Sequence, residues 1–376
     1  MENTVIADPS DAALRLVRQA ASPALCTVTQ EEAHGGIARV SVLLWNAMNE
    51  LFGNPRLISL SRGAAQPGMA GKARFSWDVA RCQVTRRVDW LIFDHLHIAV
   101  TQNLIPARFR APYAIFLHSI EAWDSLSPAR ERVLRQAAVR LANSHHTAQR
   151  IAQAHPDVGP IEVCHLALLR EQQSLGQDQE AWPFPNIGPS AVLVVGRMSS
   201  AERYKGHDQL LAAWPEVKRS IPDAQLLVVG RGDDVPRLQA AAAATGYSDS
   251  ILFFGRISDA ALDSLYGQAA VFAMPSRCEG FGLVYLEAMS RRLPCIASVN
   301  DAAREVVEDG ITGLLVEQSD VAALARDLIQ LLGNPTLRRE MGEAGWRRCR
   351  TQFSFDRFKQ RFSEVMRPVI DRPIGA

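Results

Sequence analysis

Short apolar runs alternate along the chain with longer segments in which apolar residues recur every three or four positions. The short runs are rich in β-branched and aromatic residues, and this composition predicts strands. The longer segments have the period of amphipathic helices, as Ile37, Val40, Leu44 and Met48 illustrate after Gly35-Gly36. The alternation predicts parallel sheets covered by helices, which is the α/β fold class.

The pattern assigns nine strands and six helices to particular segments. The predicted strands are Ala24–Thr29, Leu57–Leu60, Trp90–Phe93, Ala114–Leu117, Ala191–Val195, Gln225–Val229, Ile251–Phe254, Ala270–Met274 and Cys295–Ser298. The predicted helices are the one that follows Gly36, then Ala129–Leu141, His146–Ala154, Gln209–Ser220, Asp320–Leu332 and Phe355–Met366.

The pattern is interrupted once, over residues 171–190, where Trp182-Pro183-Phe184-Pro185 is followed by Gly188-Pro189. Prolines and glycines at this density break regular structure. We therefore predict an N-terminal domain over residues 1–182, a linker over 183–190 and a C-terminal domain over 191–354. The amphipathic tail, 355–376, is predicted to cross back to the N-terminal domain. A length of 376 residues suits two domains.

Composition narrows the choice of partners. The net charge of +1 predicts no general attraction to nucleic acid, but residues 51–150 hold fourteen Arg or Lys against six Asp or Glu. Such an excess suits an anionic membrane surface or a phosphorylated acceptor, and a solvated basic face is the alternative. The six cysteines form no C-x-x-C pair, and no signal peptide or spanning segment is evident. We expect a cytoplasmic protein, with peripheral contact to the inner membrane face as the alternative.

The segment 277–287 carries the most specific chemistry. Glu279 and Glu287 flank the turn Gly280-Phe281-Gly282, which has the features of a helix start after the strand that ends near Met274. The first N–H groups of a helix are unpaired and can bind an anion, while glycines let a phosphate approach the backbone. These features predict a site for a sugar nucleotide, and the alternative is a surface loop with two solvated glutamates.

Other candidate residues follow predicted strands. Arg197 and Lys205, after the strand 191–195, are cations suited to a diphosphate, or else solvated surface charges. His118 ends the strand 114–117 and is either a site residue or a structural histidine. His95 and His97 lack a carboxylate cluster with ligand spacing, so we expect no metal. The glycine-containing segments at 34–39 and 230–235 are not G-x-G-x-x-G, and P-loop and G-x-S-x-G motifs are absent from the sequence.

Taken together, these motifs resemble the retaining glycosyltransferases of family 4 (glycosyl transferases group 1), which have the GT-B fold. The resemblance is strongest from Val192 to Leu332. It rests on Gly196-Arg197, Lys205-Gly206, Phe254-Gly255-Arg256, Pro275-Ser276, Glu279 to Glu287, Pro294, Glu305-Val306-Val307, Gly310 and Thr312-Gly313, and more loosely on Gly35-Gly36 and His118 to Trp123.

The resemblance implies two Rossmann-like domains with parallel sheets facing a central cleft, and a donor held mainly by the C-terminal domain. The implied catalytic residues are His118, Glu279, Arg197 and Lys205. The implied donor-binding residues are Gly36, Gly255, Arg256, Gly280, Phe281, Gly282, Leu283 and Glu287. Glu287 is expected on the ribose, Arg197 and Lys205 on the diphosphate, and Glu279 and His118 on the sugar, with no cofactor and no divalent metal.

The implied reaction moves a hexose from a UDP- or GDP-linked sugar to a glycan or polyprenyl-linked acceptor in polysaccharide biosynthesis. The alternatives are an epimerase or phosphorylase of the same fold, or a catalytically silent sugar-nucleotide-binding protein. Two departures from the family pattern bear on the site. Ala302-Ala303 stands where a Gly-Gly pair is common, and Arg292 stands where a glycine usually ends the helix, a conformation that costs a non-glycine residue about 1 kcal/mol.

Overall fold

The computed structural model describes residues 22–29, 35–61, 68–169 and 187–371. The chain divides into two compact units, Met1–Leu166 with Phe355–Ala376, and Ala167–Ser354. The predicted boundary at residue 182 and half of the predicted linker, residues 183–186, lie outside the described residues. Helix α15 (Phe355–Val365) groups with the first unit, where it packs on helix α2 (Gly36–Phe52).

The first unit is built around a six-stranded sheet in which every pairing is parallel, in the order β2-β1-β3-β4-β5-β6. Its strands are β1 (Pro23–Thr27), β2 (Arg56–Ser59), β3 (Trp90–Phe93), β4 (Tyr113–Leu117), β5 (Val139–Ala142) and β6 (Glu162–Val163). Its helices, besides α2 and α15, are α3 (Met69–Val84), α4 (Leu96–Ala99), α5 (Pro128–Gln136), α6 (His145–Ala154) and α16 (Arg367–Ile370).

The predicted helix Ala129–Leu141 is wrong in its second half. The helix ends at Gln136, and Val139–Ala142 form β5, which pairs with β4 between Ala114 and Val139. Four residues carry too little periodicity to distinguish a buried strand from the last turn of a helix, so pairing with a neighbouring strand decided the outcome. The short strand β6 was likewise not predicted.

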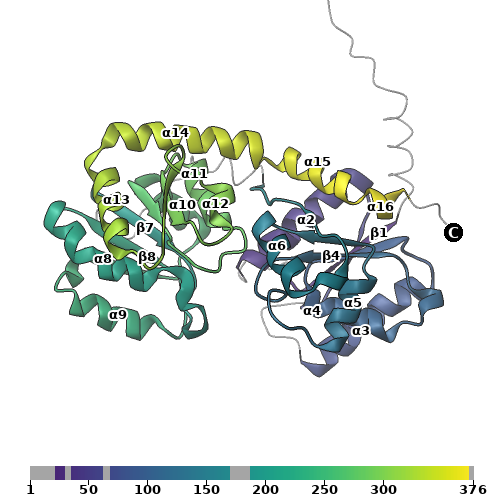
Figure 1. The fold of residues 1–376 in the computed structure, drawn as a ribbon. Helices are drawn as coiled ribbons and strands as arrows, with labels where there is room; N and C mark the ends of the chain where they lie inside the picture. The colour runs from purple at the N-terminus through teal and green to yellow at the C-terminus, as the bar shows by residue number, and fades with distance from the viewer. Residues whose placement is uncertain (1–21, 30–34, 62–67, 170–186, 372–376) are drawn as a thin grey trace, which may run out of the picture. The chain divides into compact units, whose positions relative to one another are not determined.

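The second unit has a sheet of the same kind, with the order β12-β11-β10-β7-β8-β9 and parallel pairings throughout. Its strands are β7 (Ala191–Val195), β8 (Gln225–Val229), β9 (Ile251–Gly255), β10 (Val271–Ala273), β11 (Cys295–Ser298) and β12 (Gly313–Val316). Its helices are α8 (His207–Ser220), α9 (Val235–Ala244), α10 (Asp259–Gln268), α11 (Leu283–Ser290), α12 (Ala303–Val306), α13 (Val321–Gly333) and α14 (Pro335–Gln352). Figure 1 shows β7 and β8 between the α8–α13 pair and helices α10 and α11.

Strand order determines where each sheet can hold a ligand. In the second unit the order runs outward from β7 in one direction and from β10 in the other, so the connections diverge between these two strands. In the first unit the same divergence lies between β1 and β3. Open α/β sheets bind ligands outside the carboxyl ends of the strands at such a point. A ligand is therefore expected at the loops after β7 and β10, and at those after β1 and β3.

The turn after α11 has the left-handed conformation that is unusual for the residue found there. Arg292 has φ 57° although it is not glycine. Its guanidinium bonds Glu343, at 2.8 Å from Nε, and lies 4.3 Å from the centre of the Trp346 ring. These contacts with α14 offset the backbone cost of about 1 kcal/mol. Among the described residues, no helix has the length and apolarity needed to cross a bilayer.

Candidate functional site

The loops after β7 and β10 meet at the predicted position in the second unit. Gly206, which precedes α8, has φ 92°, and a Cβ there would lie 2.7 Å from the carbonyl oxygen of Pro275. The amide of Arg277 also donates to the carbonyl of Tyr204 at 3.0 Å. Only glycine allows this contact, and it holds Lys205 beside the loop that carries Glu279.

Lys205 and Glu279 form an ion pair with 2.6 Å between Nζ and Oε2. Both side chains are largely buried. Burial alone would lower the pKa of Lys205, but the charge and hydrogen bond of Glu279 outweigh it, so the pKa is raised and the ammonium stays charged. The structure thus brings together the cation predicted for a diphosphate and the acid predicted for a sugar.

Arg197 is placed differently from Lys205. Its side chain is 72% exposed and pairs with Glu202. Burial is the main reason that the pKa of the Tyr204 phenol is raised. The positive charges of Lys205 and Arg197 lower this pKa, and the negative charge of Glu279 raises it. Lys205 is therefore largely buried, with its ammonium 5.6 Å from the centre of the Tyr204 ring, whereas Arg197 lies at the surface.

Asp301 is a site residue that the sequence did not reveal. Its side chain is fully buried and accepts hydrogen bonds from the Ser276 hydroxyl at 2.5 Å, the Glu279 amide at 2.9 Å and the Ala303 amide at 3.0 Å. Burial raises the pKa of this carboxyl to about 6, against the lowering effect of these bonds. Asp301 therefore fixes the loop that presents Glu279. The only sequence signal was a polar residue just beyond an apolar strand.

Asp301 also explains how the chain does without the Gly-Gly pair common in the family pattern. Its Oδ1 accepts the amide of Ala303, the first residue of the short helix α12, and the Ala302 amide donates to the Glu279 carbonyl at 3.1 Å. A side-chain bond thus shapes a loop that would otherwise depend on backbone freedom.

Helix α11 begins at Leu283, one residue after the predicted turn. Gly282 has φ 88°, and a Cβ there would lie 2.4 Å from the Tyr285 ring, so this position requires glycine. Phe281 is buried, and Tyr285 donates its hydroxyl to the Met274 carbonyl at 2.5 Å. Phe281 and Tyr285, which are buried on either side of Gly282, therefore hold the first amides of α11 close to the end of β10.

Glu287 lies one turn into α11 and accepts a hydrogen bond from the Tyr266 hydroxyl of α10 at 2.9 Å. Sequence reasoning missed Tyr266, because a tyrosine at a helical position normally indicates packing. The two glutamates therefore have different surroundings, Glu279 beside Lys205 and Glu287 beside a phenol. Gly255, with φ 64°, ends β9, and Arg256 follows it as an exposed residue.

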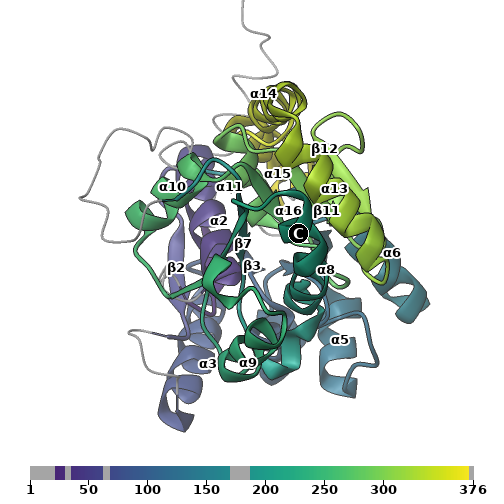
Figure 2. The same cartoon turned by 90° about the vertical axis from the view of Figure 1, so that its left-hand side faces the viewer.

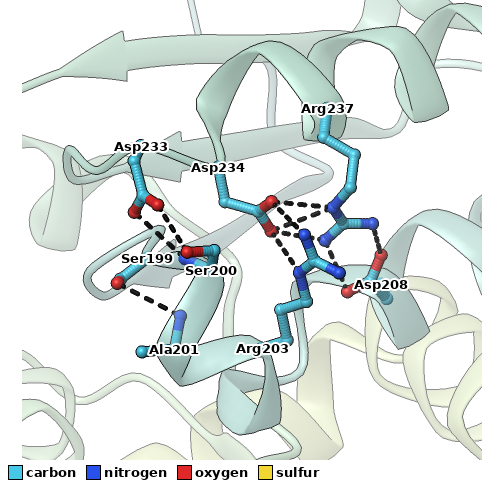
Figure 3. A network of polar contacts seen from close by, with 8 residues as sticks. All are labelled: Ser199, Ser200, Ala201, Arg203, Asp208, Asp233, Asp234 and Arg237. Carbon is cyan, nitrogen blue, oxygen red and sulfur yellow. Dashed lines mark hydrogen bonds and ion pairs between the residues drawn. The ribbon is translucent and has the colours of Figure 1, made fainter.

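Two acids, Asp233 and Asp234, lie in the loop after β8, and the charge of Asp234 is neutralised by its neighbours. Figure 3 shows the Asp234 carboxylate between two guanidinium groups, those of Arg203 at 2.9 Å and Arg237 at 2.6 Å. The hydrogen bond from Arg237 is the main reason that the pKa of Asp234 is lowered to about 2. Arg237 also bonds Asp208 of α8 at 2.6 Å.

Asp233 bonds the amide and hydroxyl of Ser200, at 3.0 and 2.5 Å, on the loop that leads to Lys205 (Figure 3). The two acids are therefore structural. They connect the loop after β8 to the one that carries the site lysine, so they do not oppose an anion at the β7 edge.

In the first unit, the loops after β1, β3 and β4 surround a buried polar group. Asp94 accepts hydrogen bonds from the Thr27 hydroxyl at 2.6 Å and the Val28 amide at 3.1 Å, and burial raises its pKa. The ring Nε2 of His118 lies 2.5 Å from the Asp94 carbonyl. A carbonyl can only accept, so this nitrogen carries a hydrogen. His118 therefore has a fixed orientation at the divergence point of the first sheet.

Glu121 and His95 complete this group. Glu121 accepts the Ser119 amide at 2.8 Å and also bonds the His118 amide. Burial opposes ionisation of Glu121, but the charges of His118 and His95 lower its pKa. The pKa of His95 is lowered to about 4, mainly by burial and secondly by the charge of His118. Gly36, the other predicted residue of this unit, begins α2 after Gly35, whose φ is 85°.

His207 gives a testable prediction of pH dependence. It is buried beside Gly196 among apolar side chains such as Val194 and Leu210, and burial lowers its pKa to about 4 from 6.5. The folded chain therefore binds this proton more weakly than the unfolded chain. The stabilising contribution is complete above pH 6.5 and is lost as the pH falls towards 4, by about 3 kcal/mol.

We expect His207→Leu to remove that part of the acid sensitivity. Urea unfolding at several pH values should show the wild-type chain gaining stability relative to His207→Leu as the pH rises from 4.5 to 7. His145→Ala, at an exposed histidine, serves as the control and should leave the profile unchanged. A wild-type slope in His207→Leu would contradict the assignment.

Comparison with known proteins identifies the family that part of this chain matches. Residues 178–348 match the family Glycosyl transferases group 1. They form a group 1 glycosyl transferase domain. This confirms the family resemblance predicted from the sequence, and the Lys205–Glu279 pair, Asp301 and helix α11 all lie within the glycosyl transferase domain.

Two relatives extend the comparison. A GDP-mannose-dependent monoacylated alpha-(1-6)-phosphatidylinositol monomannoside mannosyltransferase of Corynebacterium glutamicum is 38% identical over 169 residues, covering 43% of this chain and 44% of that protein. A GDP-mannose-dependent alpha-(1-6)-phosphatidylinositol monomannoside mannosyltransferase of Mycolicibacterium smegmatis is 32% identical over 233 residues, covering 59% and 61%. The chain spans about half the length of the curated relatives it matches.

The fold has counterparts among solved structures. The Anabaena protein HepE, solved in complex with UDP and glucose, has a TM-score of 0.72 and 18% identity, covering 92% of this chain and 99% of that one. At this identity the likeness concerns the fold alone. Together with the two parallel six-stranded sheets, it confirms the GT-B fold class predicted from the sequence.

Proposed function

We propose that the chain is a retaining glycosyltransferase that moves a hexose from a nucleotide-diphosphate sugar to a glycan or lipid-linked acceptor in polysaccharide biosynthesis. The observation that carries the proposal is the Lys205–Glu279 pair, held at the divergence point of the second sheet beside the first amides of α11. A cation, a carboxylate and helix N–H groups are what a sugar diphosphate requires.

Each group takes a part of the donor that its chemistry suits. Lys205 binds the diphosphate, supported by the exposed Arg197 and by the amides near Phe281 and Gly282. Glu279 accepts hydroxyl groups of the sugar. Glu287 accepts those of the ribose, and Gly255 and Arg256 lie beside the base. The family resemblance adds His118 for the sugar and Gly36 for the phosphates.

GDP-mannose is the donor to test first. Both relatives described above are GDP-mannose-dependent, whereas HepE was solved with UDP and glucose. The acceptors named for the two relatives are phosphatidylinositol mannosides. We propose an acceptor of the same chemical class, a glycan on a lipid anchor, and mannose as the transferred sugar.

For the reaction we propose front-side attack with retention of the anomeric configuration. The leaving phosphate takes the proton of the acceptor hydroxyl as the new glycosidic bond forms and the bond to phosphate breaks. Lys205 stabilises the negative charge that develops on the diphosphate, a task that a divalent metal performs in other enzymes. No cofactor or metal is therefore part of the proposal.

A thermal-shift comparison of GDP, UDP, GDP-mannose and UDP-glucose tests donor binding. A ligand at a hundred times its dissociation constant adds about 2.7 kcal/mol of stability, so the preferred donor should raise the melting temperature clearly. Glu287→Ala should remove most of that shift, because the ribose hydroxyls lose their acceptor. Glu216→Ala, at an exposed position on α8, should keep it. No shift with any of the four ligands would contradict the proposal.

A further inference from the structure

Helix α3 of the first unit is apolar on two opposite sides. Its inner side buries Phe75, Val79 and Cys82. On its outer side Met69 is 84% exposed, Trp77 is 66% exposed and Val84 is 47% exposed. A helix on the surface of a globular protein normally has charged and polar residues on the side facing water. The outer side of α3 therefore departs from what folding alone requires.

These exposed residues form one stripe. At about 100° per residue, Met69, Trp77 and Val84 fall within an arc of about 80°, opposite the buried side, with Ala73 between them. The stripe lies near the margin of its sheet, because α3 packs on β2, which pairs only with β1 among the described strands. Figure 2 shows α3 next to β2. Leu57 of β2 is also partly exposed.

Cations border the stripe. Arg74 and Arg81 lie at one edge of the arc, Lys72 lies on the other side, and Arg86 and Arg87 are exposed just beyond the end of the helix. Asp78 is the single acidic residue in the α3 sequence. Exposed Trp and Met among Lys and Arg are the composition of helices that lie in the interface of anionic bilayers.

We propose that the outer side of α3 docks the first unit on a bilayer surface that carries anionic lipids. The stripe inserts among the headgroups and acyl-chain ends, and the bordering cations bind lipid phosphates. The inference rests on the proposed function in one respect, since a lipid-linked acceptor would be presented at that surface.

The position of α3 within the first unit fits this role. Helix α3 packs on the 3-10 segment η2 (Val100–Leu104). The pKa of His97 is lowered mainly by burial, then by the charge of Arg130, and also by the charge of Lys72 on α3. Helix α3 therefore lies close to the segment that directly follows α4 (Leu96–Ala99), and the residue before α4, His95, lies beside His118 with 5.8 Å between ring centres. Docking through α3 would bring the bilayer close to the polar group of the first unit.

Co-sedimentation of the full chain with vesicles tests the proposal. The wild-type chain should bind vesicles of equal parts phosphatidylglycerol and phosphatidylcholine and bind pure phosphatidylcholine far less. Met69→Ser combined with Trp77→Ser should weaken binding about ten-fold or more, because the inserted area is lost. Arg81→Glu should weaken it roughly thirty-fold at low salt, because a cation is replaced by an anion.

Matched controls come from the second unit. Ile311→Ser removes a side chain that is 50% exposed, and Arg326→Glu reverses an exposed charge. Both should leave vesicle binding unchanged, and all variants should keep the wild-type melting temperature. Equal binding to the two vesicle types, or undiminished binding of the α3 variants, would overturn the proposal.

Size-exclusion chromatography separates docking on lipid from self-association. If the α3 variants change the oligomeric state while lipid binding persists, a second copy of the chain covers this face and the proposal is wrong. The shift in melting temperature with GDP or UDP sugars does not involve α3, so failure of the donor proposal and failure of the docking proposal are distinguishable.

Discussion

Replacing Lys205 by alanine should lower kcat/KM for sugar transfer about 100- to 1,000-fold, the loss typical when one group that stabilises developing negative charge is removed. The ammonium is held 2.6 Å from Glu279 and its pKa is raised, so it carries a full charge at neutral pH. The release of nucleoside diphosphate, measured with donor and acceptor present, gives the rate.

Two matched variants show whether the loss is specific. Lys218→Ala removes another lysine of the same unit, which bonds the backbone carbonyls of Pro222 and Ala224, and should keep the rate. Lys205→Arg keeps the charge but changes the shape of the donor group, and should recover part of the rate. Activity of Lys205→Ala within a few-fold of wild type would show that the site is assigned wrongly.

Replacing Asp301 by alanine should disable the site without touching a proposed contact to the donor. The change leaves three buried donors, on Ser276, Glu279 and Ala303, without this acceptor. At pH 5 we expect the free energy of unfolding to fall by about 3 kcal/mol, because each such donor costs on the order of 1 kcal/mol. We also expect kcat/KM to fall, because the loop that presents Glu279 loses its support.

The pH dependence of the free energy of unfolding tests whether the Asp301 carboxyl group causes the stability deficit of Asp301→Ala. The pKa of Asp301 is raised from 3.8 to about 6, so the folded chain binds this proton more tightly than the unfolded chain. The contribution of this group to stability is greatest below pH 4 and is lost as the pH rises through 6, by up to about 3 kcal/mol. The stability deficit of Asp301→Ala should therefore shrink between pH 5 and pH 8.

A variant that separates positioning from stability is Asp301→Asn. It keeps one acceptor but cannot titrate, so its stability should lack this slope while its kcat/KM lies between those of the wild-type and alanine forms. If Asp301→Ala is fully active at pH 8, Asp301 serves only stability. If its deficit is the same at pH 5 and pH 8, the raised pKa is not the cause.

The two titrations at this sheet oppose each other. Stability from His207 is lost as the pH falls below 6.5, and stability from Asp301 is lost as the pH rises above 4. Their slopes nearly cancel in the wild-type chain, so a flat wild-type profile is compatible with both assignments. Only the two single variants, measured side by side, show the separate contributions.

Much of the fold followed from the sequence because its strands are short apolar runs with clear ends. β3, β7 and β8 occur at the predicted residues, and α11 begins one residue after Gly282. Gly282 in the 280–282 turn was informative because its positive φ of 88° is one that other residues rarely adopt. The parallel sheets followed from alternation alone, since each strand must cross over to the next.

Other features were decided by contacts between segments far apart in the sequence. Val139–Ala142 became a strand because β4 lies alongside, and Arg292 keeps its left-handed backbone because Glu343 and Trp346 hold its side chain. The pattern of a single segment contains no information about such neighbours.

The alternation of strands and helices, the glycine turn at 280–282 and the charged residues at the strand ends could all be read from the sequence. The folded structure was needed to establish that Lys205 pairs with Glu279 while Arg197 stays at the surface, that Asp301 supports the loop and that Asp233 and Asp234 are structural. The difference arises because periodicity and turn chemistry act between near neighbours, whereas an ion pair or a buried carboxylate depends on which loops the sheet brings to the same edge.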